Sequence, residues 1–517
     1  MSAQAARATA SKSEDSDQRS ALRGAARNTA WGGVGGVAGA LGTFLTTFLV
    51  ARALGASNAG LLYSAIAVAT VASGVLTLGA DTGLVWSLAR NRSTADGRHV
   101  RALLRLASLP VIVASALGGL VIWFTAPVLS DWLGGGETLE TALRVMIVAI
   151  ALGPLEAVLA QGTRGLGDVR PLVLLHRAGV PLGRCLAIAL VAVLGPLTVT
   201  NLALAWTAPV VLALVGSAVV IRRRAGAALD GSAPPAPTSR ALVGEFWRYA
   251  LARGVATTGS LALTWTDVLL VAALASPTEA GIYAAASRFA LAGKLAIEAL
   301  RLGIAPQISV AHARGDHQRV GLLYDVTTQW GIVVCWPICV TIAGFAPLLL
   351  GVFGTEFRAG STALVVIIVG VMVAVAVGNV GTVLLMTGNS AGYARVVWAA
   401  LAVNVMVNLV AIPRLGIIGA AIAWAAGMAV ENVGGLVLLA RRGDLRLNGT
   451  GLVTTAAVTL AMTLVALVAA RVMAGDDIGG LAIHVGLVAI GMAGLVTLFR
   501  DRLQLRALVN RSRGGHA

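Results

Sequence analysis

The amino-acid sequence predicts an all-α polytopic membrane protein with about 14 transmembrane helices, arranged as two pseudo-symmetric six-helix bundles and a C-terminal helix pair. Three observations predict this class: apolar segments as long as a bilayer is thick, an uneven distribution of positive charge, and an internal repeat. Hydrophobic residues make up 57% of the 517 residues and charged residues 12%. Soluble domains carry about 25% charged residues, so the composition favours a membrane bundle.

A helix needs roughly 20 mostly apolar residues to cross a bilayer. Segments such as 364–377 do not alternate polar and apolar residues as the strands of a membrane barrel do, which leaves helices as the spanning structure. The predicted spans are 29–50, 59–80, 104–126, 141–163, 171–194, 199–221, 246–271, 280–304, 325–350, 360–384, 391–412, 416–440, 451–473 and 478–499. The predicted organisation is a disordered cytoplasmic tail at 1–28, a first bundle at 29–221, a cytoplasmic linker at 222–245, a second bundle at 246–440, the helix pair at 451–499 and a cytoplasmic tail at 500–517.

The positive charges lie mainly on one predicted side. The opposite loops hold only Arg52, Arg358, Arg414 and Arg471 among the 39 Lys and Arg residues, apart from those within spans. By the positive-inside rule, the basic side and both termini are predicted to be cytoplasmic. The net charge of +16 is then explained by topology and by contact with anionic lipids, and nucleic acid is not expected as a partner.

Two pairs of glycines indicate that the second bundle repeats the first. Gly60 and Gly281 each follow the first helix of a bundle, and Gly167 and Gly388 each follow the fourth; both pairs are separated by 221 positions. Six helices separate the related segments, so the two bundles have the same orientation. This arrangement is typical of parallel-repeat transporters, in which the substrate site lies between the repeats near the bilayer midplane.

Charged side chains inside the predicted spans are the candidate site residues, because such residues are costly in a bilayer and usually face a cavity. The cations are Arg144, Arg177, Arg184, Arg253, Arg288, Lys294 and Arg301. The acids are Glu156, Asp267, Glu298 and Glu431, with Asp81 at the end of a span. The excess of cations predicts an anionic substrate. Arg144, Arg177 and Arg301 lie close enough to helix ends for their charged groups to reach the interface instead.

The planar guanidinium of Arg can bind two oxygens of a diphosphate at once, and Lys adds a compact charge. We therefore expect a cationic central cavity that binds substrate through the following residues: Arg184, Arg253, Arg288, Lys294, Arg301 and Arg177. The four acids are candidates either for ion coupling or for pairing with cations. Lys294 and Glu298 lie four residues apart and could form a structural ion pair, so this alternative stays open.

Several motifs are similar to those of polysaccharide flippases of the multidrug/oligosaccharidyl-lipid/polysaccharide (MOP) exporter superfamily. In the first half these are the segments 51–63 (ARALGASNAGLLY), 78–84 (LGADTGL) and 164–167 (RGLG). In the second half they are 267–270 (DVLL) and 280–288 (AGIYAAASR). Asp81 stands one place later than the usual acid, and Val268 occupies a position where the family often has a basic residue.

The resemblance covers roughly residues 23–500 and implies a transporter that flips a polyprenyl-diphosphate-linked oligosaccharide from the cytoplasmic to the outer leaflet of a bacterial inner membrane. It implies lipid-linked glycan and membrane lipids as partners, with glycan-biosynthesis enzymes as candidate neighbours. The sequence contains neither a phosphate-binding loop nor a His-Glu-x-x-His motif, so we expect no enzymatic activity, no cofactor and no metal. The alternatives are a multidrug or cation antiporter of the same superfamily, which would prefer an acid-lined cavity, and a membrane-embedded glycan polymerase or ligase.

Overall fold

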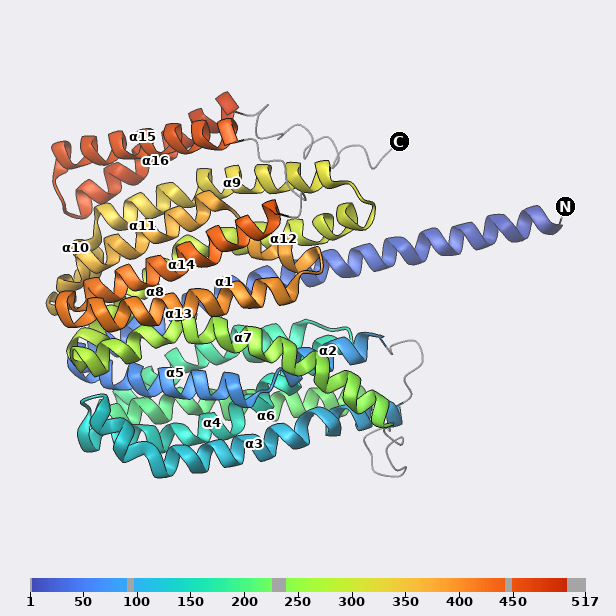
Figure 1. Ribbon diagram of the computed structural model, residues 1–517, viewed down its shortest axis with the longest axis horizontal. Helices are drawn as coiled ribbons and strands as arrows, with labels where there is room; N and C mark the ends of the chain where they lie inside the picture. The colour runs from blue at the N-terminus through green and yellow to red at the C-terminus, as the bar shows by residue number, and fades with distance from the viewer. Residues whose placement is uncertain (1, 91–96, 226–238, 442–448, 500–517) are drawn as a thin grey trace.

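The structure is a computed structural model that describes the backbone of residues 2–90, 97–225, 239–441 and 449–499. Within these ranges, the side chains of residues 2–30, 97, 225, 291–303, 306, 449–450, 496 and 498–499 are not described. The secondary structure of the described ranges is helical, and the long helices lie side by side in a single bundle (Figure 1). This result confirms the predicted all-α fold.

The helices follow one another through short connections. The first part of the chain forms α1 (Ser2–Leu76), α2 (Ala80–Arg90), α3 (Gly97–Trp132), α4 (Gly136–Gly165), the π-helix η1 (Leu172–Arg177), α5 (Gly179–Leu194) and α6 (Val199–Ala225). The second part forms α7 (Arg240–Leu274), α8 (Pro277–Ala313), α9 (His317–Gly344), α10 (Ala346–Gly351), the 3₁₀-helix η3 (Thr355–Gly360), α11 (Ser361–Val377), α12 (Val380–Met386), α13 (Ser390–Leu415), α14 (Ile417–Ala440), α15 (Gly449–Ala474) and α16 (Ile478–Phe499).

Twelve segments in the described part are long and apolar enough to cross a membrane, so the predicted count of 14 is not confirmed. One of the twelve, Trp31–Arg90, contains two predicted spans in a single segment of 60 residues. The predicted span 280–304 corresponds to α8, much of which lies among the side chains that are not described. The protein is nevertheless a multi-span helical membrane protein.

The first helix changes direction at Gly55, whose φ of 70° is left-handed. The Tyr63 hydroxyl donates a hydrogen bond to the Thr47 carbonyl oxygen at 3.3 Å, and residues 16 apart in a straight helix would be about 24 Å apart. The two limbs of α1 therefore form a hairpin around Gly55. We call this end of the bundle the Gly55 end and the opposite end, where α2 stops, the Arg90 end.

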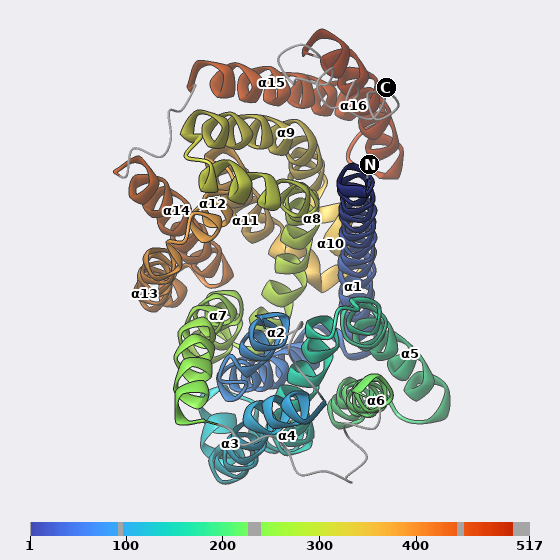
Figure 2. The same ribbon diagram turned by 90° about the vertical axis from the view of Figure 1, so that its right-hand side faces the viewer.

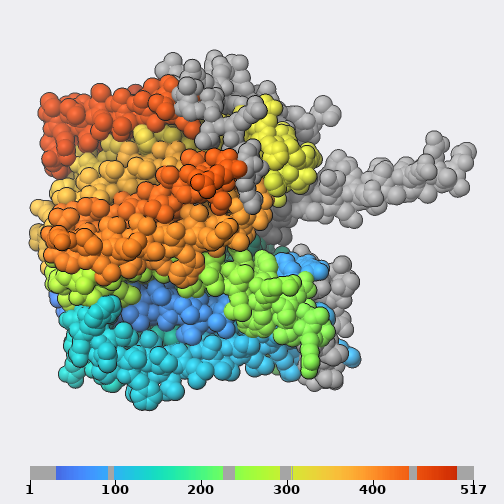
Figure 3. Space-filling model, viewed as in Figure 1, coloured from blue at the N-terminus to red at the C-terminus, as the bar shows by residue number. Residues whose placement is uncertain are grey.

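The chain forms two groups of helices with α7 between them. In Figure 2, α2–α6 and the returning limb of α1 lie on one side, and α8–α14 lie on the other. On the face that Figure 3 shows, the green surface of α7 separates the cyan surface of α3 from the orange surface of α13 and α14. The helix α7 packs on α1 and α2 as well as on α13, and α15 packs on α9. A division into two six-helix bundles and a final pair stays a prediction.

Backbones of the two parts touch at two places where only glycine fits. A Cβ on Gly60 would lie 1.8 Å from the Pro277 carbonyl oxygen, and a Cβ on Gly281 would lie 2.0 Å from that of Ala56. One of the two glycine pairs that the repeat identifies, Gly60 and Gly281, therefore meets near the Gly55 end. Toward the Arg90 end, a Cβ on Gly79 would lie 2.0 Å from the Ala250 carbonyl oxygen and 2.6 Å from the Gly254 nitrogen.

A short segment of the second part also covers the junction at the Gly55 end. The Phe353 ring lies between Phe44 of α1 and Phe289 of α8, each at a centroid distance of 5.7 Å. The Glu356 carboxylate accepts a hydrogen bond of 2.7 Å from the Ala56 backbone nitrogen, next to the bend in α1. The two parts are thus joined at this end by an aromatic cluster and by a carboxylate that satisfies a broken helix end.

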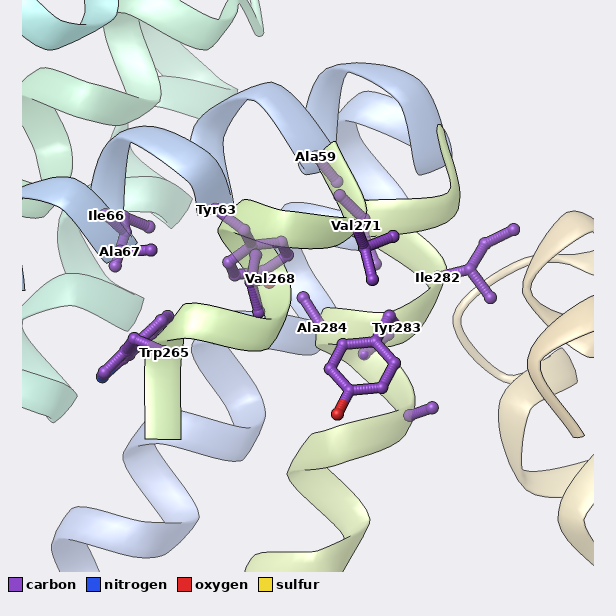
Figure 4. Packing of buried hydrophobic residues seen from close by; sticks show 14 of the residues in the cluster. Ala59, Tyr63, Ile66, Ala67, Trp265, Val268, Val271, Ile282, Tyr283 and Ala284 are labelled. Carbon is purple, nitrogen blue, oxygen red and sulfur yellow. The ribbon is translucent and has the colours of Figure 1, made fainter. Parts of the chain in front are cut away.

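The main hydrophobic core lies along α1, α7 and α8. Figure 4 shows Ala59, Ile66, Val268, Val271 and Ala284 packed between these helices, and all five are buried. Small residues allow the helices to approach closely, which is how helices associate in membranes. The same close packing holds the buried polar groups in place.

Three predicted segments either differ from their expected structure or lie partly or wholly outside the described residues. The helix α1 begins at Ser2, whereas the polar composition of residues 1–28 predicts a disordered tail; the segment is rich in Ala and Arg, which favour helix formation. Much of the predicted linker 222–245 and all of the predicted tail 500–517 lie outside the described residues.

Candidate functional site

A buried carboxylate in the first part is paired with a histidine. Glu156 of α4 is 2% exposed, and its Oε2 lies 2.7 Å from Nδ1 of His176. His176 belongs to η1, a π-helix whose wider turn is uncommon and often marks a functional site. The His176 side chain is 38% exposed, so the pair connects an accessible ring to the protein interior. The other carboxylate oxygen of Glu156 has no hydrogen-bond partner among the described residues.

Arg184 of α5 lies over an aromatic ring. Its guanidinium carbon is 3.6 Å from the centre of the Trp206 ring, and Nε donates a 3.2 Å hydrogen bond to the Trp206 carbonyl oxygen. The charge of Arg184 also interacts with that of Glu156. The cation is therefore positioned by α6 and balanced at longer range by the carboxylate on α4.

A second acid and cation extend this group of charges toward α7. Asp81 of α2 interacts electrostatically with both His176 and Arg253. Arg253 directly precedes Gly254, and Asp81 lies two residues after Gly79; the backbones of these two glycines are in contact. Nε of Arg253 is buried and has no hydrogen-bond partner in the described part of the chain. These interacting charged residues therefore extend from Arg184 on α5 to Arg253 at the junction of the two parts.

Arg288 of α8 is a deeply buried cation at the junction itself. It is 7% exposed, and its guanidinium carbon lies 4.6 Å from the centre of the Trp265 ring. Its charge interacts with the hydroxyl groups of Tyr63 from α1 and Tyr283 from α8; both tyrosines and Trp265 are labelled in Figure 4. Nε of Arg288 has no hydrogen-bond partner among the described residues, and no salt bridge of Arg288 is formed there. Among the described side chains, it is aromatic groups that lie around this cation.

Asp267 of α7 is completely enclosed by hydrogen-bond donors. One carboxylate oxygen accepts from Nδ2 of Asn404 at 2.9 Å and from Nδ2 of Asn408 at 2.7 Å. The other accepts from the Tyr283 hydroxyl at 3.0 Å. Asp267 is 1% exposed and both asparagines are fully buried. This network fastens α7, α8 and α13 together.

The remaining predicted residues lie elsewhere. Arg177 is exposed on η1, and Glu431 of α14 accepts a 2.8 Å hydrogen bond from the Tyr393 hydroxyl. Arg144 forms an ion pair of 2.7 Å with Glu140. The side chains of the predicted trio on α8 are not among those described: Lys294, Glu298 and Arg301.

The sequence prediction missed the partners that surround these charges. His176 was overlooked, although it stands next to Arg177 in a segment bounded by Pro171 and Pro181. Asn404 and Asn408 also carried a signal, because two amides four residues apart share one face of an apolar helix. No sequence signal indicated that Arg184 contacts Trp206 or that Arg288 contacts Trp265, because the partners lie on different helices.

Comparison with solved structures identifies the fold. The lipid II flippase MurJ in an inward closed conformation superposes with a TM-score of 0.72 at 12% identity, covering 91% of this chain and 99% of that chain. An inward-facing multidrug resistance transporter of the MATE family, in the MOP superfamily, superposes with a TM-score of 0.63 at 15% identity, covering 78% and 94%. The chain thus has the helical membrane fold of MOP superfamily transporters.

Comparison of sequences then places the chain within that class. A family model described as polysaccharide biosynthesis protein matches residues 25–312, more than half of the chain, and the chain belongs to this family. The probable low-salt glycan biosynthesis flippase Agl15 of Haloferax volcanii is 26% identical over 181 residues, which are 35% of this chain. The match spans 38% of the length of that relative.

Proposed function

We propose that this protein flips an anionic lipid-linked glycan, of the polyprenyl-diphosphate-linked oligosaccharide class, across a bacterial inner membrane by alternating access. The family membership and the similarity to two proteins described as flippases support this proposal. In the proposed orientation the Arg90 end is cytoplasmic, because the basic loops lie there. The glycan would enter from that end and leave from the Gly55 end.

The observation that carries the proposal is the burial of the Arg288 guanidinium without a paired carboxylate in the described part. A guanidinium that is 7% exposed at the junction of the two parts has its charge unmatched by any carboxylate within hydrogen-bonding distance in the described part. A buried charge without a paired acid is costly, so its retention is best explained by a ligand that supplies negative charge. A diphosphate group would do this, since Arg binds phosphate oxygens in a bidentate manner.

Other cations extend the proposed binding path. Arg184 interacts with Glu156 and Arg253 with Asp81, and Nε of Arg253 has no hydrogen-bond partner in the described part. Lys294, Arg301 and Arg177 stay predicted contributors. The backbone contacts near Gly60 and Gly79 close the junction at two levels, so separation of the two parts at one level at a time would give alternating access.

The test uses proteoliposomes that contain a fluorescent polyprenyl-diphosphate N-acetylglucosamine and a membrane-impermeant quencher. The wild-type protein is expected to expose the inner-leaflet probe to the quencher, and Arg288→Gln to abolish that exposure. Arg144→Gln is the matched control, because Arg144 is already paired with Glu140; it should flip the probe normally. Folding of each variant is checked by its thermal unfolding.

The same vesicles decide between this function and its alternatives. Failure of the wild-type protein to flip the probe, together with export of a cationic dye, would favour a multidrug antiporter. Normal flipping by Arg288→Gln would overturn the role of the buried cation while leaving the flippase function in place. Formation of longer glycans from the probe would favour a polymerase.

A further inference from the structure

The helix α7 has two exposed faces of different chemistry. One is apolar and includes Leu251 and Val255, which are 47% and 53% exposed. The other carries Thr257, Ser260 and Thr264, which are also exposed. These three residues are spaced i, i+3 and i+7, so they share one side of the helix, and we call them the hydroxyl stripe. An aliphatic face is suited to lipid, whereas polar groups at membrane depth usually face a water-filled space.

Toward the Gly55 end, the face of the hydroxyl stripe continues into the junction of the two parts. Val268 and Val271 follow Thr264 by four and seven residues and therefore lie in line with it. They are 1% and 0% exposed, and Figure 4 shows both packed among residues of α1 and α8. The hydroxyl stripe thus points along the junction, and the apolar face of α7 points toward the lipid.

Toward the Arg90 end, the same face is closed again. Ala250 and Phe246 precede Thr257 by seven and eleven residues, and both are fully buried. A Cβ on Gly83 of α2 would lie 2.9 Å from the Ala250 Cβ and 3.1 Å from the Phe246 ring. Contacts between the two parts therefore bound the hydroxyl stripe at both ends.

The hydroxyl stripe begins at about half the depth of the membrane. Thr264 lies ten residues from the end of α7 at Leu274, which is about 15 Å along the helix axis. The hydrocarbon core of a bilayer is about 30 Å thick. Parallel-repeat transporters bind their substrates near the midplane between the repeats, and the stripe lies at that depth.

Each hydroxyl group of the stripe already donates its hydrogen within the helix. The acceptor is the backbone carbonyl oxygen three or four residues earlier in the chain, at 3.0 Å for Thr257, 3.3 Å for Ser260 and 2.9 Å for Thr264. A hydroxyl group has one hydrogen and two lone pairs, so each oxygen is left as an acceptor. A row of acceptors fits a ligand with many O–H donors, and a sugar is such a ligand, whereas a lipid chain offers no donor.

Arginines stand at both ends of the hydroxyl stripe. Arg253 precedes Thr257 by four residues on the same face, and its buried Nε has no hydrogen-bond partner in the described part. At the other end, Thr264 is followed by Trp265, and the Arg288 guanidinium carbon lies 4.6 Å from the centre of that ring. Arg288 is 7% exposed, and its Nε likewise has no partner among the described residues. These positive charges disfavour a cationic ligand and favour one that carries phosphate.

We propose that the hydroxyl stripe of α7 is a subsite for the sugars of the lipid-linked glycan, with the diphosphate held at Arg288 and sugar hydroxyl groups donating to Thr264, Ser260 and Thr257. This inference rests on the proposed function and adds the surface that recognises sugar rather than phosphate. The stripe extends over seven residues, about 10 Å. The sugars nearest to the diphosphate therefore contact it, and a longer glycan extends beyond it.

The placement of the stripe is tested on the full-length protein in lipid nanodiscs, with single cysteines and a charged thiosulfonate reagent that reacts in water. The three native cysteines are buried, so the wild-type protein gives the background. Ser260→Cys should react about tenfold faster than Val255→Cys, because the thiolate is the reactive form and an apolar environment suppresses it. Val255→Cys is the matched control, since Val255 is exposed on the apolar face of the same helix. Equal rates, or a faster reaction at residue 255, would overturn the placement.

Sugar recognition is tested by the binding of two fluorescent lipids to the same nanodiscs, polyprenyl-diphosphate N-acetylglucosamine and polyprenyl diphosphate without a sugar. A triple variant, Thr257→Val with Ser260→Ala and Thr264→Val, removes the hydroxyl groups from exposed positions. It should bind the sugar-bearing lipid about tenfold more weakly, since each hydrogen bond contributes modestly to affinity, and the sugar-free lipid as the wild type does. Thr258→Val is the matched control, because it removes a hydroxyl group from a different face of α7; it should bind both lipids normally.

The two lipids separate failure of the subsite from failure of the proposed function. If the triple variant bound both lipids as tightly as the wild type, or lost affinity for both equally, the sugar subsite would be overturned and the proposed function would stand. If the wild-type protein bound neither lipid, the proposed function would fail and the assignment of the stripe to sugar would fail with it. The cysteine reactions would still show whether the stripe faces water.

Discussion

The two most deeply buried carboxylates among the described residues, Glu156 in the first part of the molecule and Asp267 in the second, have opposite surroundings. Asp267 accepts three hydrogen bonds from neutral donors on two other helices and has 1% of its surface exposed. Glu156 is equally buried but has one bonded oxygen, one unpaired oxygen and an accessible histidine as its partner. Both oxygens of the Asp267 carboxylate have donors, which fix its position, whereas one oxygen of Glu156 has no partner in the described part of the chain. We infer that Asp267 holds α7, α8 and α13 together and that Glu156 contributes less to the stability of the fold.

The largest effect is expected at Asp267. Asp267→Ala removes the acceptor of three buried donors, and each orphaned group costs about 1–3 kcal/mol. We therefore expect the free energy of unfolding to fall by several kcal/mol, measured by thermal unfolding in detergent. Asn408→Ala removes one of the three donors to Asp267, together with a hydrogen bond to Asn404, and serves as a graded control with a smaller loss. An Asp267→Ala variant as stable as the wild type would contradict the assignment of Asp267 to structure.

The contact between Gly60 and Gly281 should give the next largest effect. Gly60→Ala places a Cβ 1.8 Å from the Pro277 carbonyl oxygen, and overpacking of this kind costs about 1–3 kcal/mol. Because the contact joins the two parts at the Gly55 end, the strain is relieved by separating them there. Labelling of a cysteine placed beside Gly281 should therefore become faster in Gly60→Ala.

Gly79→Ala is the matched change toward the Arg90 end and should leave labelling at the Gly55 end unchanged or slower. Gly79 also has a φ of 68°, so this variant carries backbone strain as well as overlap. If both variants increased labelling at the Gly55 end equally, the two contacts would not act as separate closures.

The two tryptophans that lie against arginines allow a finer comparison. Trp206→Leu and Trp265→Leu each remove a cation–π contact worth about 2 kcal/mol when desolvated. Arg184 keeps its hydrogen bond to the backbone oxygen of residue 206 after the change, whereas Nε of Arg288 has no partner to retain in the described part. We expect Trp265→Leu to be the more destabilising of the two by thermal unfolding. The reverse order would show that the Trp206 backbone contact contributes little.

The sequence predicted the helical membrane fold because composition and segment length determine it almost alone, and it identified the glycines of the repeat that meet in space. It also singled out Glu156, Asp267, Arg184 and Arg288, since a charge inside an apolar span is conspicuous wherever its partner lies. It could not show that both oxygens of Asp267 are hydrogen-bonded while one oxygen of Glu156 is not. Two of the donors to Asp267, Asn404 and Asn408, lie more than a hundred positions away in sequence. The partner of Glu156 lies on a π-helix, which no local sequence pattern predicts. The contrast between the two acids is a property of packing.

The smallest change in stability is expected for Glu156→Gln. The amide oxygen can still accept from Nδ1 of His176, and the variant removes a buried negative charge at the expense of its interaction with Arg184. These effects oppose each other. The free energy of unfolding should therefore change by less than about 1 kcal/mol, which is the typical loss for a single substitution. Thermal unfolding of Glu156→Gln beside Asp267→Asn, which also exchanges an acid for its amide, makes the comparison direct. Asp267→Asn introduces an amide group among donors and should cost more. Equal losses in the two variants would mean that Glu156 contributes as much to stability as Asp267, and the contrast between the two acids would disappear.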